Sequence, residues 1–280
     1  MGLRAATIIA MEDWSGIDTV LCDLDGVIWL AHQPIAGSVG AIARLRASGR
    51  RVLFVTNNSA AVEADNERAL GSVGIDAVGD VVSSARAAAQ LVEPGARVLV
   101  AGGPGITEAV EHRGAVTVLN DGRHEPDGFD AVVVGLHRDF DYHRLSVASA
   151  AVRAGARLIG TNTDSTFPTP AGLLPGGGSI LAAIATASGT TPVIGGKPHQ
   201  PMADVIAELV GTADRPFDPD SVLMVGDRLD TDGLFAQRIG CRFALVRSGV
   251  TPPGADIDTP VAADVADLAA VADRLTRSTR

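Results

Sequence analysis

Short apolar runs alternate with segments of helical periodicity along most of the chain. Runs such as Arg51–Thr56, Arg97–Ala101 and Ser221–Gly226 are rich in valine and leucine, as buried strands are. The segments between them repeat apolar residues every three or four positions, which is typical of amphipathic helices. This alternation predicts βαβ units, and therefore a largely parallel sheet with helices on both faces.

The same pattern gives a full set of expected elements. A first strand starts at Thr19 and carries two aspartates near its carboxyl end. Further strands are expected at residues 51–56, 81–83, 97–101, 116–119, 131–135, 157–160, 192–195, 221–226 and 242–246. Helices are expected at residues 38–48, 60–73, 85–92, 105–112, 141–154, 180–188, 202–210 and 262–277, and in a segment that ends at Gly240. Residues 119–130 and 162–178 are rich in turn formers.

A restart of this rhythm indicates the domain organisation. At 280 residues the chain exceeds an average domain, which has roughly 150 residues. A second series of strands and helices starts near Ala87, and the last third returns to the opening pattern. We therefore expect an α/β protein whose Rossmann-like parallel-sheet core combines residues 1–86 and 190–280, with a second α/β domain inserted at residues 87–189.

Composition narrows the partners and the compartment. The net charge of −10 and the pI near 5.0 argue against nucleic acid or an anionic membrane surface as a partner. The two cysteines have no metal-ligand spacing and give no disulfide framework, and the lack of such a framework suits a reducing cytoplasm. Cys22 is expected to be a small buried hydrophobe. The apolar run Ala5–Met11 is too short to span a membrane. We predict a soluble cytoplasmic protein with a loose leader before Trp14.

The first strand runs into the sequence DLDG, residues 23–26. Strand alternation places Asp23 and Asp25 on the face opposite Cys22, so two carboxylates would share a small space. Like charges this close need a cation between them or a retained proton. A divalent metal on one carboxylate would leave the other to move protons. Taken alone, the segment fits equally well a turn that closes a buried strand.

Other polar residues also follow predicted strands. In chain order they are Thr56, Asn57 and Asn58, then Lys197, then Asp227 and Asp232. Because ligands bind at the carboxyl ends of parallel strands, this set suits phosphoryl transfer, which needs a nucleophile, an acid and cations at the phosphoryl oxygens. Lys197 is the sole lysine among 23 basic residues, and a compact ammonium at a strand end suits a phosphate. An arbitrary surface lysine is the alternative.

Four motifs in order carry a family resemblance. They are DxDGV (Asp23–Val27), TNNS (Thr56–Ser59), GKP (Gly196–Pro198) and GDRLDTD (Gly226–Asp232). Together they resemble the haloacid dehalogenase-like (HAD) phosphatase superfamily, and more narrowly its large-capped subfamily IIA of glycerol-phosphate, phosphoglycolate and 4-nitrophenyl phosphatases. The resemblance spans most of the chain, and it implies that the inserted domain is a cap on a catalytic core.

The resemblance also implies roles for these residues. Asp23 would be the nucleophile and Asp25 the general acid and base, with Lys197 as the catalytic cation. The residues implied at the phosphate are Thr56, Asn57, Asn58 and Lys197. The residues implied at a Mg²⁺ cofactor are Asp23, Asp25 through its backbone carbonyl, Asp227 and Asp232. The reaction implied is magnesium-dependent hydrolysis of a small phosphorylated metabolite through an aspartyl-phosphate, and a homodimer is compatible with the family.

The inserted domain gives a slight indication of the substrate. Its segment Thr161–Ile180 also resembles that subfamily, whereas His137 stands where we expect an aspartate. We interpret His137 as an exposed loop histidine rather than a residue that changes the pocket charge. The aromatic residues in this domain are Phe129, Phe140, Tyr142 and Phe167. They supply a poor stacking platform for a nucleobase, which favours glycerol 3-phosphate or 2-phosphoglycolate.

Two alternatives remain open. The sequence AGGPG (Ala101–Gly105) lies between a strand and a helix and resembles part of a dinucleotide site, which would make the protein an oxidoreductase. It lacks the full GxGxxG spacing, however, and fits a tight strand-to-helix turn. The other alternative is a non-catalytic sensor of phosphate ligands on the same fold, which would have little use for both Asp23 and Asp25.

Overall fold

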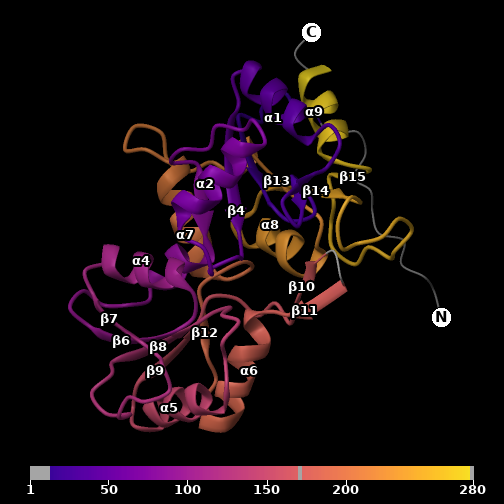
Figure 1. Cartoon of the computed structure of the whole chain (residues 1–280). Coiled ribbons are helices and arrows are strands. Elements are labelled where there is room, and N and C mark those ends of the chain that lie inside the picture. Colours follow the sequence, from indigo (N-terminus) through magenta and orange to yellow (C-terminus); the bar gives the residue numbers. More distant parts are fainter. Residues whose placement is uncertain (1–12, 170–171, 278–280) are drawn as a thin grey trace, which may run out of the picture. The chain divides into compact units, whose positions relative to one another are not determined.

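The computed structural model describes residues 13–169 and 172–277, which form two units (Figure 1). The first unit combines the described residues of Met1–Val55, Glu67–Val81 and Ala203–Arg280, and the second combines Thr56–Asn66 and Val82–Met202. Residues 56–66 thus group with the second unit, while the predicted division into core and cap stays a prediction. The predicted loose leader lies outside the described residues, apart from Asp13.

The sheet of the first unit has the strand order β15-β14-β13-β1-β4-β5. Its strand β1 (Thr19–Cys22) pairs in parallel with β13 (Val222–Gly226) on one side and with β4 (Arg51–Thr56) on the other. All four residues of β1 are buried, as its apolar sequence predicts. The other strands are β14 (Arg242–Val246), β15 (Ala263–Val265) and β5 (Val81–Ser83). The predicted α/β class with parallel sheets is confirmed.

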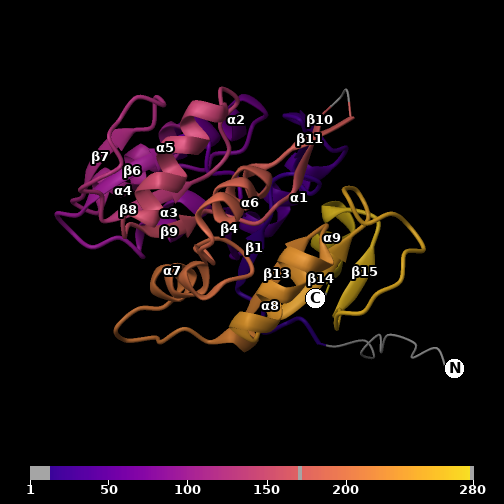
Figure 2. The ribbon, with the colours of Figure 1, turned by 90° about the horizontal axis from the view of Figure 1, so that it is seen from below.

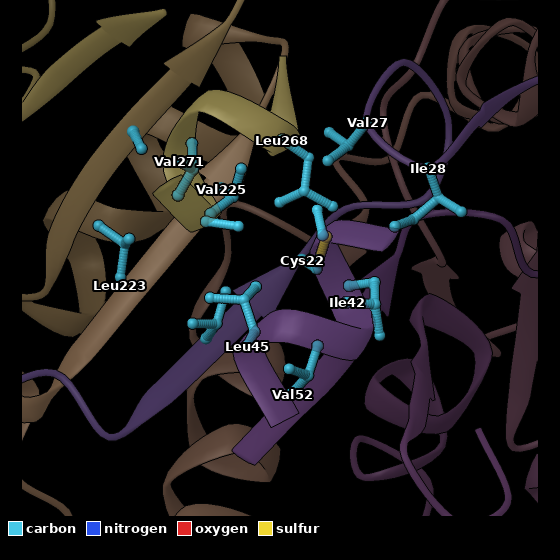
Figure 3. Packing of buried hydrophobic residues seen from close by; sticks show 14 of the residues in the cluster. Cys22, Val27, Ile28, Ile42, Leu45, Val52, Leu223, Val225, Leu268 and Val271 are labelled. Atoms are coloured by element: carbon cyan, nitrogen blue, oxygen red, sulfur yellow. The ribbon is translucent and has the colours of Figure 1, made fainter. Parts of the chain in front are cut away.

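The hydrophobic core of this unit lies between the sheet and two helices that pack on each other, α1 (Ser38–Ala47) and α9 (Leu268–Arg277) (Figure 3). Cys22 is fully buried in it, so the prediction of a small buried hydrophobe is confirmed. Each large aliphatic side chain buried here contributes about 1.5–3 kcal/mol. The remaining helices that reach this unit are α2 (Glu63–Ser72), α7 (Gln200–Val210) and α8 (Leu234–Ile239), with the short turns η1 (Pro219–Ser221) and η2 (Leu229–Gly233).

The second unit has a five-stranded parallel sheet, with helices on both faces (Figures 1 and 2). Side chains alternate along its strand β6: Leu99 and Ala101 pack with α5 and α6, whereas Val98 and Val100 pack with α3 and α4. In sheet order the strands are β12 (Val193–Ile194), β9 (Arg157–Gly160), β8 (Ala131–Val134), β6 (Arg97–Ala101) and β7 (Val116–Leu119). The helices are α3 (Ser84–Ala89), α4 (Pro104–His112), α5 (Tyr142–Arg153) and α6 (Gly177–Ser188).

Three stretches differ from the predicted elements. Residues 263–265 form the edge strand β15 rather than the start of the last helix, because pairing with β14 overrides their alanine-rich helical pattern. The turn-rich stretch 162–178 contains the hairpin of β10 (Thr166–Thr169) and β11 (Gly172–Pro175). A second hairpin, β2 (Trp29–Leu30) with β3 (Gln33–Pro34), follows the DLDG turn. Within the described ranges, no helix is both long and apolar enough to cross a bilayer.

A buried arginine joins the two ends of the first unit's sequence. Arg50 is 6% exposed. Its Nε donates to the carbonyl of Ile17 at 3.0 Å, and its Nη2 donates to the carbonyl of Leu275 at 3.1 Å. A third donor, Nη1, reaches Oγ of Ser48 at 2.7 Å. One side chain therefore satisfies backbone groups before β1 and at the end of α9.

We predict that Arg50→Met lowers the free energy of unfolding by about 2–6 kcal/mol, because two buried carbonyl groups lose their donors at about 1–3 kcal/mol each. Urea unfolding measures this change. Arg44→Met is the matched control, since Arg44 forms a solvent-exposed pair with Asp273, and its loss should change the free energy by less than about 0.5 kcal/mol. Equal effects of the two variants would contradict the prediction.

Candidate functional site

Three predicted aspartates of the first unit come together. Asp23 follows β1, Asp227 follows β13, and Asp232 lies in the η2 turn. A carboxylate oxygen of each lies within 4.8 Å of an oxygen of the other two. Their exposed fractions are 9%, 1% and 0%, respectively. We call these three residues the carboxylate cluster.

Strand pairing explains why residues about 200 positions apart in sequence meet. Cys22 pairs with Val225, so β1 and β13 end side by side in parallel, and the backbone N–H of Asp23 donates to the carbonyl of Val225 at 3.0 Å. Backbone N–H groups also orient the other two carboxylates. Val250 donates to Oδ2 of Asp227 at 2.6 Å, and Arg228 donates to Oδ2 of Asp232 at 3.2 Å.

Glycines make room for the cluster. Gly26 has a φ of +84°, and a Cβ there would lie 2.3 Å from Oδ2 of Asp227. A Cβ on Gly249 would lie 2.0 Å from the same oxygen, and one on Gly226 would lie 2.2 Å from Oδ2 of Asp232. Two physical features therefore explain why glycine occupies position 26 of the DxDGV motif: its left-handed backbone conformation and the close approach of the Asp227 carboxylate.

The donor set of the carboxylate cluster fits a divalent cation. Three buried carboxylates at this separation repel one another, and a cation or a retained proton offsets that repulsion. Oxygen ligands from a few carboxylates, completed by water and substrate, are what Mg²⁺ uses in proteins. The structure thus offers side chains of Asp23, Asp227 and Asp232 for such an ion.

The carboxylate of Asp25, the other predicted aspartate, is not in this cluster. Its Oδ1 accepts a hydrogen bond from the indole Nε1 of Trp29 at 3.1 Å, and the two residues form an isolated bridge. Trp29 is buried at the start of the β2–β3 hairpin. This tryptophan was not among the predicted site residues. The turn that follows β1 brings the indole nitrogen of Trp29 to this carboxylate.

The remaining predicted residues lie together in the second unit. Thr56 ends β4 and is buried, and its Oγ1 accepts from the N–H of Asn58 at 3.0 Å. Asn58 is exposed, and its Oδ1 accepts from the N–H of Ala60 at 3.0 Å. The Lys197 side chain is 1% exposed. Lys197 is therefore an interior lysine rather than an arbitrary surface residue.

Asn57 connects the TNNS loop to the lysine loop. Its Oδ1 accepts from the backbone N–H of Lys197 at 2.9 Å, and its Nδ2 donates to the Lys197 carbonyl at 3.1 Å. Its own carbonyl accepts from Oγ of Ser84 at 2.6 Å and from Nδ2 of Asn162 at 2.7 Å. Ser84 and Asn162 were not among the predicted site residues. For Asn162 the available signal was its position at a strand end, after β9.

The AGGPG glycines pack against backbone. A Cβ on Gly103 would lie 2.4 Å from the carbonyl oxygen of Ala60, and one on Gly105 would lie 2.2 Å from that of Ala61. The N–H of Gly105 donates to the Ala60 carbonyl at 3.3 Å. A protein carbonyl thus meets the start of α4 where a dinucleotide fold would hold its pyrophosphate, so these glycines favour the reading as a tight turn.

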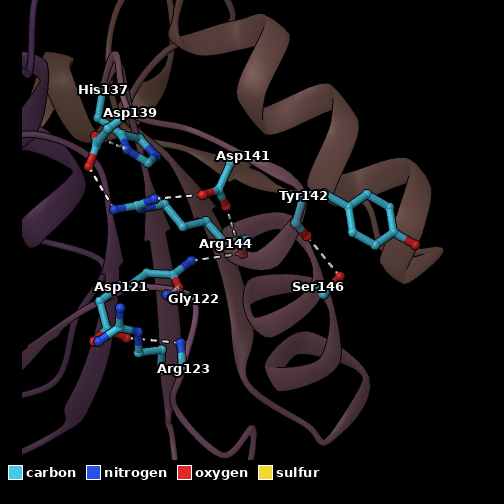
Figure 4. A network of polar contacts seen from close by, with 10 residues as sticks. Asp121, Gly122, Arg123, His137, Asp139, Asp141, Tyr142, Arg144 and Ser146 are labelled. Atoms are coloured by element: carbon cyan, nitrogen blue, oxygen red, sulfur yellow. Dashed lines mark hydrogen bonds and ion pairs between the residues drawn. The ribbon is translucent and has the colours of Figure 1, made fainter.

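His137 differs from the prediction. Its side chain is 9% exposed, so the interpretation as an exposed loop histidine is wrong. The ring packs edge-on against Phe140. Its Nδ1 lies 3.0 Å from Oδ1 of Asp139 (Figure 4). This hydrogen bond is the main cause that lowers the pKa of the Asp139 carboxyl. Arg144 forms a 2.9 Å ion pair with the same carboxylate. Contacts with Asp139 and Phe140 in the loop after β8 thus bury His137, although its loop position suggested that it was exposed.

Comparisons with known proteins give a consistent result. The family described as haloacid dehalogenase-like hydrolase matches residues 20–116, and the one described as HAD-hydrolase-like matches residues 194–276. A D-glycerol 3-phosphate phosphatase of Mycobacterium tuberculosis is 40% identical over 238 residues, which cover 83% of this chain and 64% of that protein. The chain thus spans slightly less than two thirds of that relative.

Two further comparisons match more of the other protein's length. An acid sugar phosphatase of Staphylococcus saprophyticus is 36% identical over 236 residues, which cover 82% of this chain and 86% of that protein. The crystal structure of a glycerol phosphate phosphatase from Mycobacterium tuberculosis, in complex with magnesium, has a TM-score of 0.80 and 35% identity. The match covers 91% of this chain and 77% of the crystallised chain.

We predict that Gly26→Ala weakens Mg²⁺ binding by about tenfold or more, because the new methyl group displaces an Asp227 oxygen. Substitution of a residue that orients a metal ligand typically lowers metal affinity by about 10–100-fold. Isothermal titration calorimetry with MgCl₂ measures the affinity.

Gly49→Ala is the matched control for this prediction. Gly49 has the same φ of +84°, but a Cβ there would meet nothing within 4 Å. Both variants should lose about 1 kcal/mol of stability from the backbone strain, and only Gly26→Ala should lose Mg²⁺ affinity. Unchanged binding in Gly26→Ala would show that Asp227 does not hold the ion.

Proposed function

This chain belongs to the haloacid dehalogenase-like hydrolases, among the phosphatase enzymes of that family, and we propose that it hydrolyses a small phosphate monoester through an aspartyl-phosphate intermediate. The membership confirms the resemblance that the four motifs carry. The observation that carries the proposal is the carboxylate cluster, because three buried carboxylates within 4.8 Å suit a cation-dependent phosphoryl transfer.

Two aspartates would share the bond changes in this reaction. An oxygen of Asp23 would attack phosphorus while Asp25 gives a proton to the departing ester oxygen. Water would then attack the aspartyl-phosphate and pass a proton to Asp25, which regenerates Asp23 and releases inorganic phosphate. The hydrogen bond from Trp29 to Oδ1 of Asp25 supports this role, since it orients the carboxyl that must both donate and accept a proton.

The second unit would supply donors for the phosphoryl oxygens. The ammonium of Lys197 is a compact charge that offsets phosphoryl charge. Thr56 uses its oxygen as an acceptor toward Asn58, so its hydroxyl proton can donate to phosphate. Asn58, also predicted at the phosphate, stabilises the turn that follows Thr56 through its bond to Ala60.

We propose Mg²⁺ as the cofactor of the carboxylate cluster, with Asp23, Asp227 and Asp232 as side chains that would hold or flank it and the backbone carbonyl of Asp25 as a further ligand. When bound, the ion would offset the negative charge of the phosphoryl group. A related mycobacterial phosphatase has been crystallised with magnesium and with calcium. A comparison of the two ions therefore belongs in the activity assay.

We propose a small aliphatic substrate, with glycerol 3-phosphate or 2-phosphoglycolate favoured. Among the aromatic residues of the inserted domain, Phe129 is buried with the Arg97 guanidinium 4.2 Å from its ring centroid, and Tyr142 is 78% exposed at the start of α5. This supports a substrate without a flat ring. The named relatives act, by their names, on D-glycerol 3-phosphate and acid sugar phosphates.

We predict that phosphate release requires Mg²⁺ and fails with Ca²⁺. We also predict that kcat/KM is at least about tenfold higher for an aliphatic ester than for pyridoxal phosphate or mononucleotides, because differences in how substrates fit a pocket change kcat/KM by about tenfold or more. A malachite-green panel that includes glycerol 3-phosphate and 2-phosphoglycolate measures this. If a folded, Mg²⁺-binding protein turns over no ester, the sensor alternative replaces the proposal.

We also predict that Asp23→Asn lowers kcat by about 10³-fold or more, as loss of a nucleophile does, and that Asp25→Asn strongly slows phosphoenzyme formation. Asp230→Asn is the matched control within the GDRLDTD motif, since Asp230 is exposed and pairs with Arg228 on the surface. Its kcat should stay within about twofold of wild type. Full activity of Asp23→Asn would refute the assigned role.

A further inference from the structure

The Asn57 carboxamide has three polar contacts with protein groups, two to the Lys197 backbone and one to Asp164. Its Oδ1 accepts from the Lys197 N–H at 2.9 Å, and its Nδ2 donates to the Lys197 carbonyl at 3.1 Å. The second hydrogen on Nδ2 faces Oδ1 of Asp164 at 3.5 Å. Because the Lys197 N–H needs an acceptor, these contacts fix which end of the carboxamide is oxygen.

These contacts leave the carboxamide no donor for a phosphate. An asparagine side chain has two N–H donors and one carbonyl oxygen. Both donors point at protein oxygens, and a phosphate dianion has no proton to give to Oδ1. A phosphate ligand role for this side chain would therefore require it to release Lys197 or Asp164.

The surroundings of Asn57 are built for close packing with the lysine loop. A Cβ on Gly196, the residue before Lys197, would lie 2.6 Å from Asn57 Oδ1 and 2.4 Å from the carbonyl oxygen of Thr161. The N–H of Gly196 donates to that Thr161 carbonyl at 2.8 Å. The loop thus has no room for a side chain at residue 196, and its backbone is held from two sides.

We infer that Asn57 is a positioning residue that fixes the backbone of Lys197, and that its side chain is not a phosphate ligand. This inference rests on the proposed function, because it assigns Lys197 to the phosphate, and it replaces the role that the sequence implied for Asn57. Asn57 acts through Lys197: it sets where the buried ammonium stands relative to Thr56 in the same unit.

The single lysine gives a direct test of the contact. Protein labelled with ¹⁵N-lysine has one backbone amide signal, that of Lys197. In Asn57→Ala this signal should shift, and its hydrogen exchange should accelerate by about tenfold or more, since the N–H loses its acceptor. An unchanged signal and exchange rate would overturn the inference.

Asn120→Ala is the matched control. Asn120 is a buried asparagine of the second unit. Like that of Asn57, its carboxamide pairs with backbone: it donates to the Arg144 carbonyl at 2.9 Å and accepts from the Gly122 N–H at 3.2 Å. Its loss should change stability by a similar amount without moving the Lys197 signal or the affinity for phosphate. A shift of the Lys197 signal in this control would show a general loosening and count against the inference.

A double-mutant cycle tests the functional consequence. Calorimetric titration with inorganic phosphate in the presence of Mg²⁺ compares wild type, Asn57→Ala, Lys197→Met and the double variant. Asn57→Ala should weaken phosphate binding about tenfold in the wild-type background and less than about twofold in the Lys197→Met background. The effects of residues that act as one unit are not additive. Equal losses in both backgrounds would make Asn57 an independent phosphate ligand and overturn the inference.

Two further results separate the possible failures. If wild type itself neither binds phosphate nor turns over an ester, the proposed function fails, while the amide test still decides the contact. If Asn57→Ala does not fold, Asn57→Asp replaces it in the labelled experiment. This variant keeps the acceptor for the Lys197 N–H and loses the donor to the Lys197 carbonyl, so the amide exchange rate should stay near wild type while the ¹³C carbonyl signal of labelled Lys197 moves. A carbonyl signal that stays in place would overturn the inference.

Discussion

Mutual repulsion of three buried carboxylates is the constraint on which the first unit's loops depend. Asp23, Asp227 and Asp232 lie within 4.8 Å of one another and are nearly inaccessible to water, so the fold must hold them against their own charge. It does so with backbone N–H groups of Arg228 and Val250 and with glycines that let other backbone approach. A charge that is costly to assemble is held by groups that cannot move away, which is how protein sites achieve preorganisation.

The second unit solves a related problem with neutral groups. Lys197 is a buried lysine. The neutral side chain of Asn57 bonds to its backbone, and the neutral side chains of Ser84 and Asn162 bond to the Asn57 carbonyl. Fully bonded buried polar networks of this kind are rigid, because any change leaves an unmatched donor or acceptor. In both units the chemical groups stand at strand ends, and irregular backbone rather than the strands does the fine placement.

Much of the fold was predictable because local patterns agreed with tertiary ones. The apolar runs became strands, and the two series of βαβ units became two parallel sheets. Residues 263–265 were mispredicted because an alanine-rich sequence permits both helix and strand, and only pairing with β14 decides. His137 was mispredicted because its burial depends on Phe140 and Asp139. Motif spacing pointed to the aspartates, but the side-chain bonds of Trp29 and Asn162 depend on loop geometry that no periodicity encodes. The cytoplasmic location and the pairing of two copies stay predictions.

The strand order of the first sheet also affects how the chain can fold while it is being synthesised. β1 leaves the ribosome before the other strands of its sheet, yet it lies in the interior of that sheet, between β4 and a strand that begins at Val222. Residues 82–202 form their own sheet and can pair as soon as they emerge. One edge of β1 must remain unpaired until residues 23–221 have been made, because its neighbour β13 starts only at Val222. A nascent chain whose synthesis stops after the second sheet is complete and before β13 is made would therefore expose an apolar strand edge of β1, which chaperones can recognise.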